Sequence, residues 1–117
     1  MNPNPETVLM VVLYKVGTLS IDETEFSRAL NNASKKDMFF KRFRVRPGYH
    51  FSRTMDQALD MLALGGLIGR GERIGYFTVM PGLVEEGKAE FNKLTAAKKE
   101  AVEKVAELVR TYCRVEM

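Results

Sequence analysis

The chain has 117 residues, of which 45% are hydrophobic and 28% charged, with a formal net charge of +3. This length suits one domain with its own core, and the composition excludes an extended disordered protein. A single cysteine excludes an internal disulfide. The longest apolar run, Val8 to Tyr14, is too short to cross a bilayer, and the first residues lack the basic start of a signal peptide. We therefore expect a cytoplasmic protein.

The excess positive charge is confined to one segment. Residues 35–53 carry seven basic side chains and one acidic one, whereas the rest of the chain is balanced or slightly acidic. The sequence thus predicts a local basic patch on a protein that is not basic overall.

Two helices are expected before this segment. Asn4 is a good N-cap, Pro5 suits the first helical position, and the helix should run to about Val16 and end at Gly17. The β-branched residues from Val8 to Val12 leave a buried strand as the alternative. A second helix of about twelve residues follows a capping box formed by Asp22 and Glu25. Its apolar stripe consists of Phe26, Ala29, Leu30 and Ala33.

The basic segment has a different pattern. Arg42, Arg44 and Arg46 alternate with Phe43 and Val45, as in a half-buried strand with a basic outer face. We therefore expect an inserted strand or ordered loop over Phe39–Phe51, with a turn at Pro47-Gly48. If the segment is a strand, its charge can also serve only to keep a sheet edge soluble.

A helix, a hairpin and another helix follow. Ser52 should cap a helix that buries Met55, Ala58, Leu59 and Leu62, and Gly65-Gly66 ends it. Leu67-Ile68 and Ile74–Met80 are expected to form two strands joined by a charged turn over Gly69–Arg73. A fourth helix should span Gly82–Leu94, with Val84, Phe91 and Leu94 inward. This order is typical of a winged helix-turn-helix domain.

The last helix begins after Thr95 and carries an apolar stripe that needs a partner. Two partners remain open: the first helix of the same chain, or the same helix of a second chain in a homodimer. The candidate dimer contacts are Val102, Val105, Val109 and Tyr112.

Three stretches resemble a known family. They are Phe51–Leu62 with the following Leu64-Gly-Gly-Leu-Ile68, the short wing, and Leu83–Phe91. Together they are similar to the winged helix of MarR-type and PadR-type regulators, and the layout resembles that of the small YwgA-like proteins. The resemblance implies a mainly α fold with a small β wing: a winged-helix domain over residues 1–94, with a basic insert near 37–51, and a C-terminal helix over 95–117.

A winged helix that binds double-stranded DNA places the start of its third helix in the major groove. The candidate base contacts are therefore Ser52, Arg53, Thr54 and Gln57. Candidate contacts to the DNA backbone, including the wing, are Lys41, Arg42, Arg44, Arg46, Arg70 and Arg73. One feature opposes this hypothesis, because Asp56 and Asp60 give Arg53–Leu64 a net charge of −1. Two roles are left open for Asp56: an ion pair with Arg53, or a favourable position near the positive end of the helix dipole.

The leading hypothesis is therefore a sequence-specific, dimeric DNA-binding protein that regulates transcription. The alternative is a winged-helix interaction module whose third helix or basic segment docks an acidic protein partner. No acid/base pair or activated nucleophile is evident, so we expect no enzyme and no cofactor. The lone His50 and Cys113 are expected to be packing residues, and no metal site is predicted.

Overall fold

The protein is described by a computed structural model that covers residues 4–17, 20–49, 51–71, 74–112 and 114–115. Its helices are α1 (Pro5–Val16), α2 (Glu23–Ser34), α3 (Arg53–Leu64), α4 (Pro81–Asn92) and α5 (Ala96–Tyr112), with a 3-10 helix, η1 (Met38–Phe43). The strands are β1 (Ser20–Asp22), β2 (Ile68–Arg70), β3 (Tyr76–Val79) and β4 (Arg114–Val115). The coarser part of the expected fold class, a mainly helical fold with a small antiparallel sheet, is confirmed.

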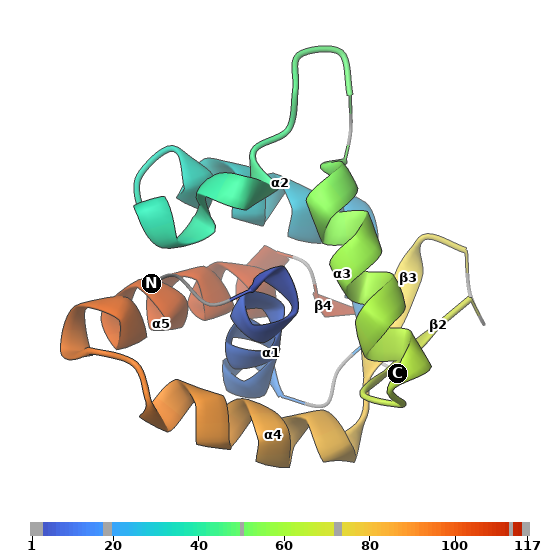
Figure 1. Cartoon of the computed structure of the whole chain (residues 1–117). Coiled ribbons are helices and arrows are strands. Elements are labelled where there is room, and N and C mark those ends of the chain that lie inside the picture. The colour runs from blue at the N-terminus through green and yellow to red at the C-terminus, as the bar shows by residue number, and fades with distance from the viewer. Residues whose placement is uncertain (1–3, 18–19, 50, 72–73, 113, 116–117) are drawn as a thin grey trace.

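Helix α1 lies at the centre of the molecule, with α4 and α5 packed along it (Figure 1). The Asn4 side chain accepts a hydrogen bond from the Thr7 N–H at 2.9 Å, which satisfies one donor at the helix start. Val8, Leu9, Val11, Val12 and Leu13 are all buried. The β-branched run that left a strand open thus belongs to a helix covered on most of its sides by other helices.

The sheet joins segments that are far apart in the sequence. Its strand order is β2-β3-β1-β4, and each neighbouring pair is antiparallel. Ile21 of β1 lies opposite Phe77 of β3, and Ile68 of β2 lies opposite Val79 of β3. All four side chains are buried. The β2-β3 hairpin is thereby attached through β1 to the helical part of the fold. Strands β1 and β4 were not predicted from the sequence.

Of the two forms expected over Phe39–Phe51, the inserted strand is wrong, whereas the ordered loop agrees with the described residues that follow a 3-10 helix. Phe39, Phe40 and Phe43 are buried from η1, which begins with the Phe39 N–H donating to the Asp37 carboxylate at 2.8 Å. An irregular segment follows, and the predicted turn at Pro47-Gly48 is confirmed by a hydrogen bond from the Tyr49 N–H to the Arg46 carbonyl. Gly48 adopts a φ of +88°, which other residues rarely do. Buried Phe43 does alternate with exposed arginines, but this alternation arises from a 3-10 helix and the loop after it, not from a strand.

Helix α5 packs on its own chain. Its stripe of Val102, Val105, Ala106 and Val109 is buried against α1 and α2. The first of the two expected partners is therefore the one observed, and this corrects the choice of Val102, Val105 and Val109 as dimer contacts, because their side chains are covered within one subunit. Tyr112 is the exposed member of that set.

Helix α4 begins one residue before the expected start, at Pro81, and ends at Asn92. Leu83 and Phe91 are buried from it, whereas Val84, expected inward, is only partly buried. Within the residues described, no helix is both long and apolar enough to cross a bilayer.

Candidate nucleic-acid interface

Helix α3 is built as its sequence predicted. The Ser52 hydroxyl accepts a hydrogen bond from the Met55 N–H at 3.0 Å and caps the helix start. Met55, Ala58, Leu59 and Leu62 are buried, as expected. The opposite face is exposed and carries Arg53, Gln57 and Asp60, with Met61 and Leu64 further along. This face is therefore polar near the helix start and apolar near its end.

A cleft of about 820 Å³ opens beside the start of α3, and we call it the α3 cleft. Four arginines line it from two segments: Arg42, Arg44 and Arg46 from η1 and the loop after it, and Arg53 from the first turn of α3. Among the described residues, none of the four arginines forms an ion pair. The remaining lining residues are Glu23, Tyr49, Phe51, Ser52, Thr54 and Asp56. The cleft thus offers an anion several guanidinium groups that no carboxylate occupies.

The structure brings most of the predicted DNA contacts to this region. Arg42, Arg44, Arg46, Arg53 and Thr54 line the α3 cleft, and Gln57 is exposed one turn further along α3. Lys41 is exposed on η1 but does not line the cleft. Ser52 is buried and its hydroxyl is used as the helix cap, so it is poorly placed for a base. Arg73 and His50 lie outside the described residues, as does Cys113.

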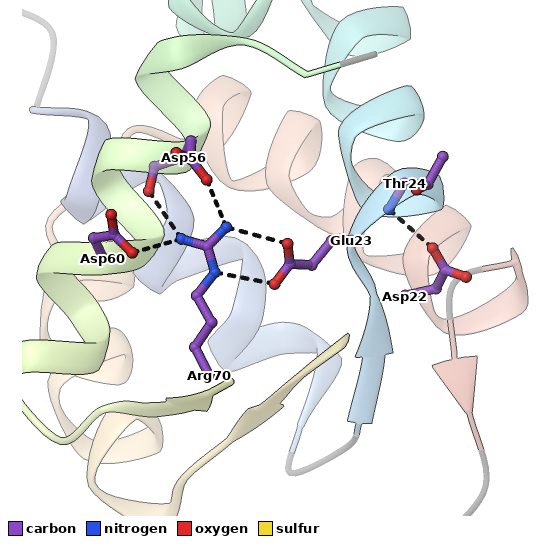
Figure 2. Close-up of polar contacts among 6 residues, drawn as sticks. All are labelled: Asp22, Glu23, Thr24, Asp56, Asp60 and Arg70. Atoms are coloured by element: carbon purple, nitrogen blue, oxygen red, sulfur yellow. Dashed lines mark hydrogen bonds and ion pairs between the residues drawn. The ribbon is translucent and has the colours of Figure 1, made fainter. Parts of the chain in front are cut away.

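Arg70 is not in the solvent-exposed turn where the sequence placed it. It is the last residue of β2, and its guanidinium points between α2 and α3 (Figure 2). Nε and Nη2 donate to the two Glu23 carboxylate oxygens at 3.0 and 3.1 Å. Nη1 and Nη2 also donate to the side chains of Asp60 and Asp56, both at 2.6 Å, and Nη1 donates to the Asp56 carbonyl at 3.2 Å. All five N–H groups of a guanidinium are thereby used.

This arrangement, the Arg70 cluster of Arg70, Glu23, Asp56 and Asp60, changes the electrostatics of α3. The hydrogen bonds to Glu23 first, and then to Asp56, raise the pKa of Arg70 above its usual value, although burial acts in the opposite direction. Arg70 therefore stays charged at any pH at which the protein is studied. Among the described residues, Asp56 pairs with Arg70 and not with Arg53, and it lies in the first turn of α3, as the second of its two expected roles requires.

The two carboxylates on the polar side of α3 are thus held by a cation from the neighbouring strand. The sequence showed both aspartates one helical turn apart, but their contact with Arg70 was not predicted. The two aspartates were the available signal, because two carboxylates on one side of a helix favour a cation that faces them.

The part of the chain that the structure describes contains no group of three or more histidine, cysteine or acidic residues able to hold a metal ion. Comparison of the chain with protein-family models, with curated proteins and with solved structures found no significant match. Any function must therefore be argued from the cleft, the exposed face of α3 and the sheet.

Proposed function

We propose that the protein is a winged-helix protein that binds double-stranded DNA and acts in the control of transcription. The observation that carries the proposal is the α3 cleft, in which four arginines, none of them paired with a described carboxylate, lie beside the exposed start of one helix. In a winged helix, the start of this helix reads bases in the major groove while neighbouring basic side chains contact phosphates.

The connections of the sheet support the winged-helix part of the proposal. Strand β1 lies between α1 and α2 in the chain, and it pairs with the second strand of the hairpin that follows α3. The hairpin is thereby held beside α3, where a wing would reach the DNA backbone next to the bound helix.

The charge distribution supports binding to phosphates as well. Glu23 and Asp56 line the cleft, but both carboxylates accept hydrogen bonds from Arg70. The two carboxylates on the described lining of the cleft thus share one cation, Arg70, which also pairs with Asp60. The acidic character of α3, which opposed DNA binding at the level of sequence, is therefore partly offset by the fold.

The proposal is tested by fluorescence anisotropy of the full chain with a labelled duplex of mixed sequence, titrated at several salt concentrations. We expect binding that weakens steeply with salt, because each phosphate contact adds roughly 0.9 to the slope of log affinity against log salt. Replacing Arg42, Arg44 and Arg46 together by glutamine should lower that slope by up to about 2.7, on the same relation. Affinity should fall alike for all sequences.

The control for this experiment replaces Lys88, Lys93 and Lys104 by glutamine. Lys88 lies on α4, Lys93 directly follows that helix and Lys104 lies on α5; all three are exposed, and their replacement changes the net charge by the same amount. For this triple lysine variant, the slope of log affinity against log salt should stay near that of the unaltered protein. The proposal is wrong if the duplex does not bind at low salt, or if both triple variants lose the same affinity.

Base readout is predicted for the start of α3. Arg53→Ala and Gln57→Ala should each change the sequences selected from a random duplex pool, because a bidentate contact to a base discriminates by about 1–3 kcal/mol. The salt slope should change little for Gln57→Ala, which removes no charge. Selection of the same sequences by both variants and the unaltered protein would rule out readout by these two side chains.

One observation favours a second function, that of a protein-interaction module. Leu64 has 83% of its surface exposed at the end of α3, and Met61 is exposed one turn before it. Exposed apolar side chains beside a basic cleft also suit a partner protein with an acidic surface. Stable co-purification of such a partner, together with no salt-sensitive binding to duplex DNA, would select this function.

A further inference from the structure

A second depression adjoins the α3 cleft and is lined by the same loop. This second depression, the loop hollow, has a volume of about 650 Å³. It is lined by Asn31, Lys35, Arg44, Val45, Arg46, Pro47, Gly48 and Tyr49. Arg44, Arg46 and Tyr49 line both the cleft and the hollow. The loop between η1 and α3 rises from the body of the protein in Figure 1, so both of its sides are accessible.

The basic side chains follow this path from one side of the loop to the other. Lys35 lies in the loop hollow, Arg44 and Arg46 belong to both depressions, and Arg42 and Arg53 lie in the α3 cleft. The only carboxylates on the described lining are Glu23 and Asp56, and both are held by Arg70. A chain of phosphates would therefore meet cations along the whole path.

Two aromatic side chains lie along the same path. Tyr49 has 69% of its surface exposed and Phe51 has 40%. Within the described residues, neither ring stacks on another ring or lies beneath a cation. Exposed rings between cationic side chains are the arrangement that binds single-stranded nucleic acid, because each base can stack on a ring while its phosphate contacts a cation.

We propose that the α3 cleft and the loop hollow bind unpaired nucleotides of a DNA strand, with phosphates on the arginines and a base stacked on Tyr49. A paired base inside a duplex has both faces covered by its neighbours, so away from the duplex ends Tyr49 can stack only on a base that is unpaired. This inference rests on the proposed function, because both take DNA as the ligand. It adds a site for unpaired nucleotides to the proposed site for duplex DNA. The volume of the cleft lies within the roughly 300–1,000 Å³ typical of small-ligand pockets, which leaves room for a nucleotide.

The test compares three labelled DNA ligands by anisotropy with the full chain at low salt. They are a blunt duplex, the same duplex with a thymidine overhang of about eight nucleotides, within the roughly 4–16 that single-strand sites cover, and that overhang alone. We expect the overhang to tighten binding of the duplex by about tenfold, the effect of one well-stacked base. A uridine oligonucleotide of equal length is the fourth ligand and tests for RNA.

Variants at Tyr49 assign the effect to stacking. Tyr49→Ala should remove most of the overhang advantage, and Tyr49→Phe, which keeps the ring, should retain it. Affinity for the blunt duplex should be the same in both. The matched control is Tyr112→Ala, because Tyr112 is exposed to the same degree, 70%, but lies on α5 away from the cleft.

The inference is wrong if blunt and overhang duplexes bind equally, or if Tyr49→Ala and Tyr112→Ala behave alike; the proposed function survives both results as long as the blunt duplex binds. Binding of the overhang alone through Tyr49, without binding of the blunt duplex, supports the inference and removes the proposed function. Tighter binding of the uridine oligonucleotide than of thymidine overturns the assignment to DNA.

Discussion

Replacing Gly87 by alanine is expected to lower the free energy of unfolding by about 1–3 kcal/mol, the usual cost of overfilling a close-packed contact. A Cβ atom built at Gly87 would lie 2.6 Å from the Tyr14 Cβ and 2.7 Å from the Met10 carbonyl oxygen. One of these atoms is backbone and the other is fixed directly to it, so neither can rotate away. The clash can be relieved only by moving α4 away from α1.

The helical propensity of alanine acts against this loss but does not reverse it. Alanine is favoured over glycine within a helix by at most about 1 kcal/mol. The matched control is Gly82→Ala on the same helix, where a Cβ would meet only the Leu67 Cδ2 at 3.7 Å, an ordinary contact. Urea unfolding followed by circular dichroism should show a clear loss for Gly87→Ala and no loss for Gly82→Ala. Equal stabilities of the two variants would contradict the close approach of α1 and α4.

Gly87 also lies in one of the stretches from which a winged helix was predicted. It is the glycine within Leu83–Phe91. Its surroundings show that the residue is needed where α4 crosses α1, because a side chain there has no room. The glycine in this stretch is therefore explained by the packing of α4 against α1, and it gives no information about what the protein binds.

Helices could be predicted well because their signals are local. The caps at Asn4 and Ser52 make the hydrogen bonds expected of them, and the spacing of Met55, Ala58, Leu59 and Leu62 identified the buried face of α3. Asp22 caps α2 by accepting from the Thr24 and Glu25 N–H groups, as a capping box requires. The Glu25 carboxylate, however, binds Arg28.

Strands β1 and β4 escaped prediction because they are short and depend on distant partners. Three residues are too few to show alternation, and Ser20 finds its partners at Thr78 and Val115. The opposite error occurred in the basic segment, where alternation was present but no strand forms. The better signal there was Asp37, a helix cap followed by aromatic side chains at helical spacing.

The candidate site was predictable in its composition but not in its charge balance. The sequence placed Arg42, Arg44 and Arg46 near Arg53, and the structure gathers them in one cleft. The Arg70 cluster could not be seen, because Arg70 is 14 residues from Asp56 and 47 from Glu23. A contact over such separations depends on how the hairpin sits against α2 and α3, which no local pattern encodes.

Replacing Arg70 by methionine is expected to lower the free energy of unfolding by about 2–4 kcal/mol, near the cost of leaving a buried charge without its partner. The Glu23 side chain is only 12% exposed, so its carboxylate would lose its cation without gaining much water. Asp56 and Asp60 are exposed and can hydrate, and they therefore add little to the loss. Urea unfolding of the variant measures the change.

Arg28→Met is the matched control for Arg70→Met, because Arg28 is an exposed arginine that pairs, among the described residues, with Glu25 alone. It should cost no more than about 1 kcal/mol, as surface ion pairs do. Adding Glu23→Met to Arg70→Met should recover much of the loss, since a buried ion pair replaced by apolar side chains is often neutral. A loss of equal size in Arg28→Met and Arg70→Met would mean that the Arg70 cluster contributes nothing beyond a surface pair.

The Arg70 cluster also links the stability of the fold to the proposed binding of DNA. Without Arg70, the carboxylates of Asp56 and Asp60 would face the phosphates with no cation between them, and the duplex should bind more weakly. Anisotropy measured at a temperature where Arg70→Met is fully folded separates this effect from unfolding. Arg70→Lys keeps the charge but not the five-donor geometry. This variant should therefore bind the duplex more tightly than Arg70→Met does, and it should be less stable than the unaltered protein. Unchanged affinity in the folded methionine variant would show that the pairing of these carboxylates with Arg70 is not needed for binding.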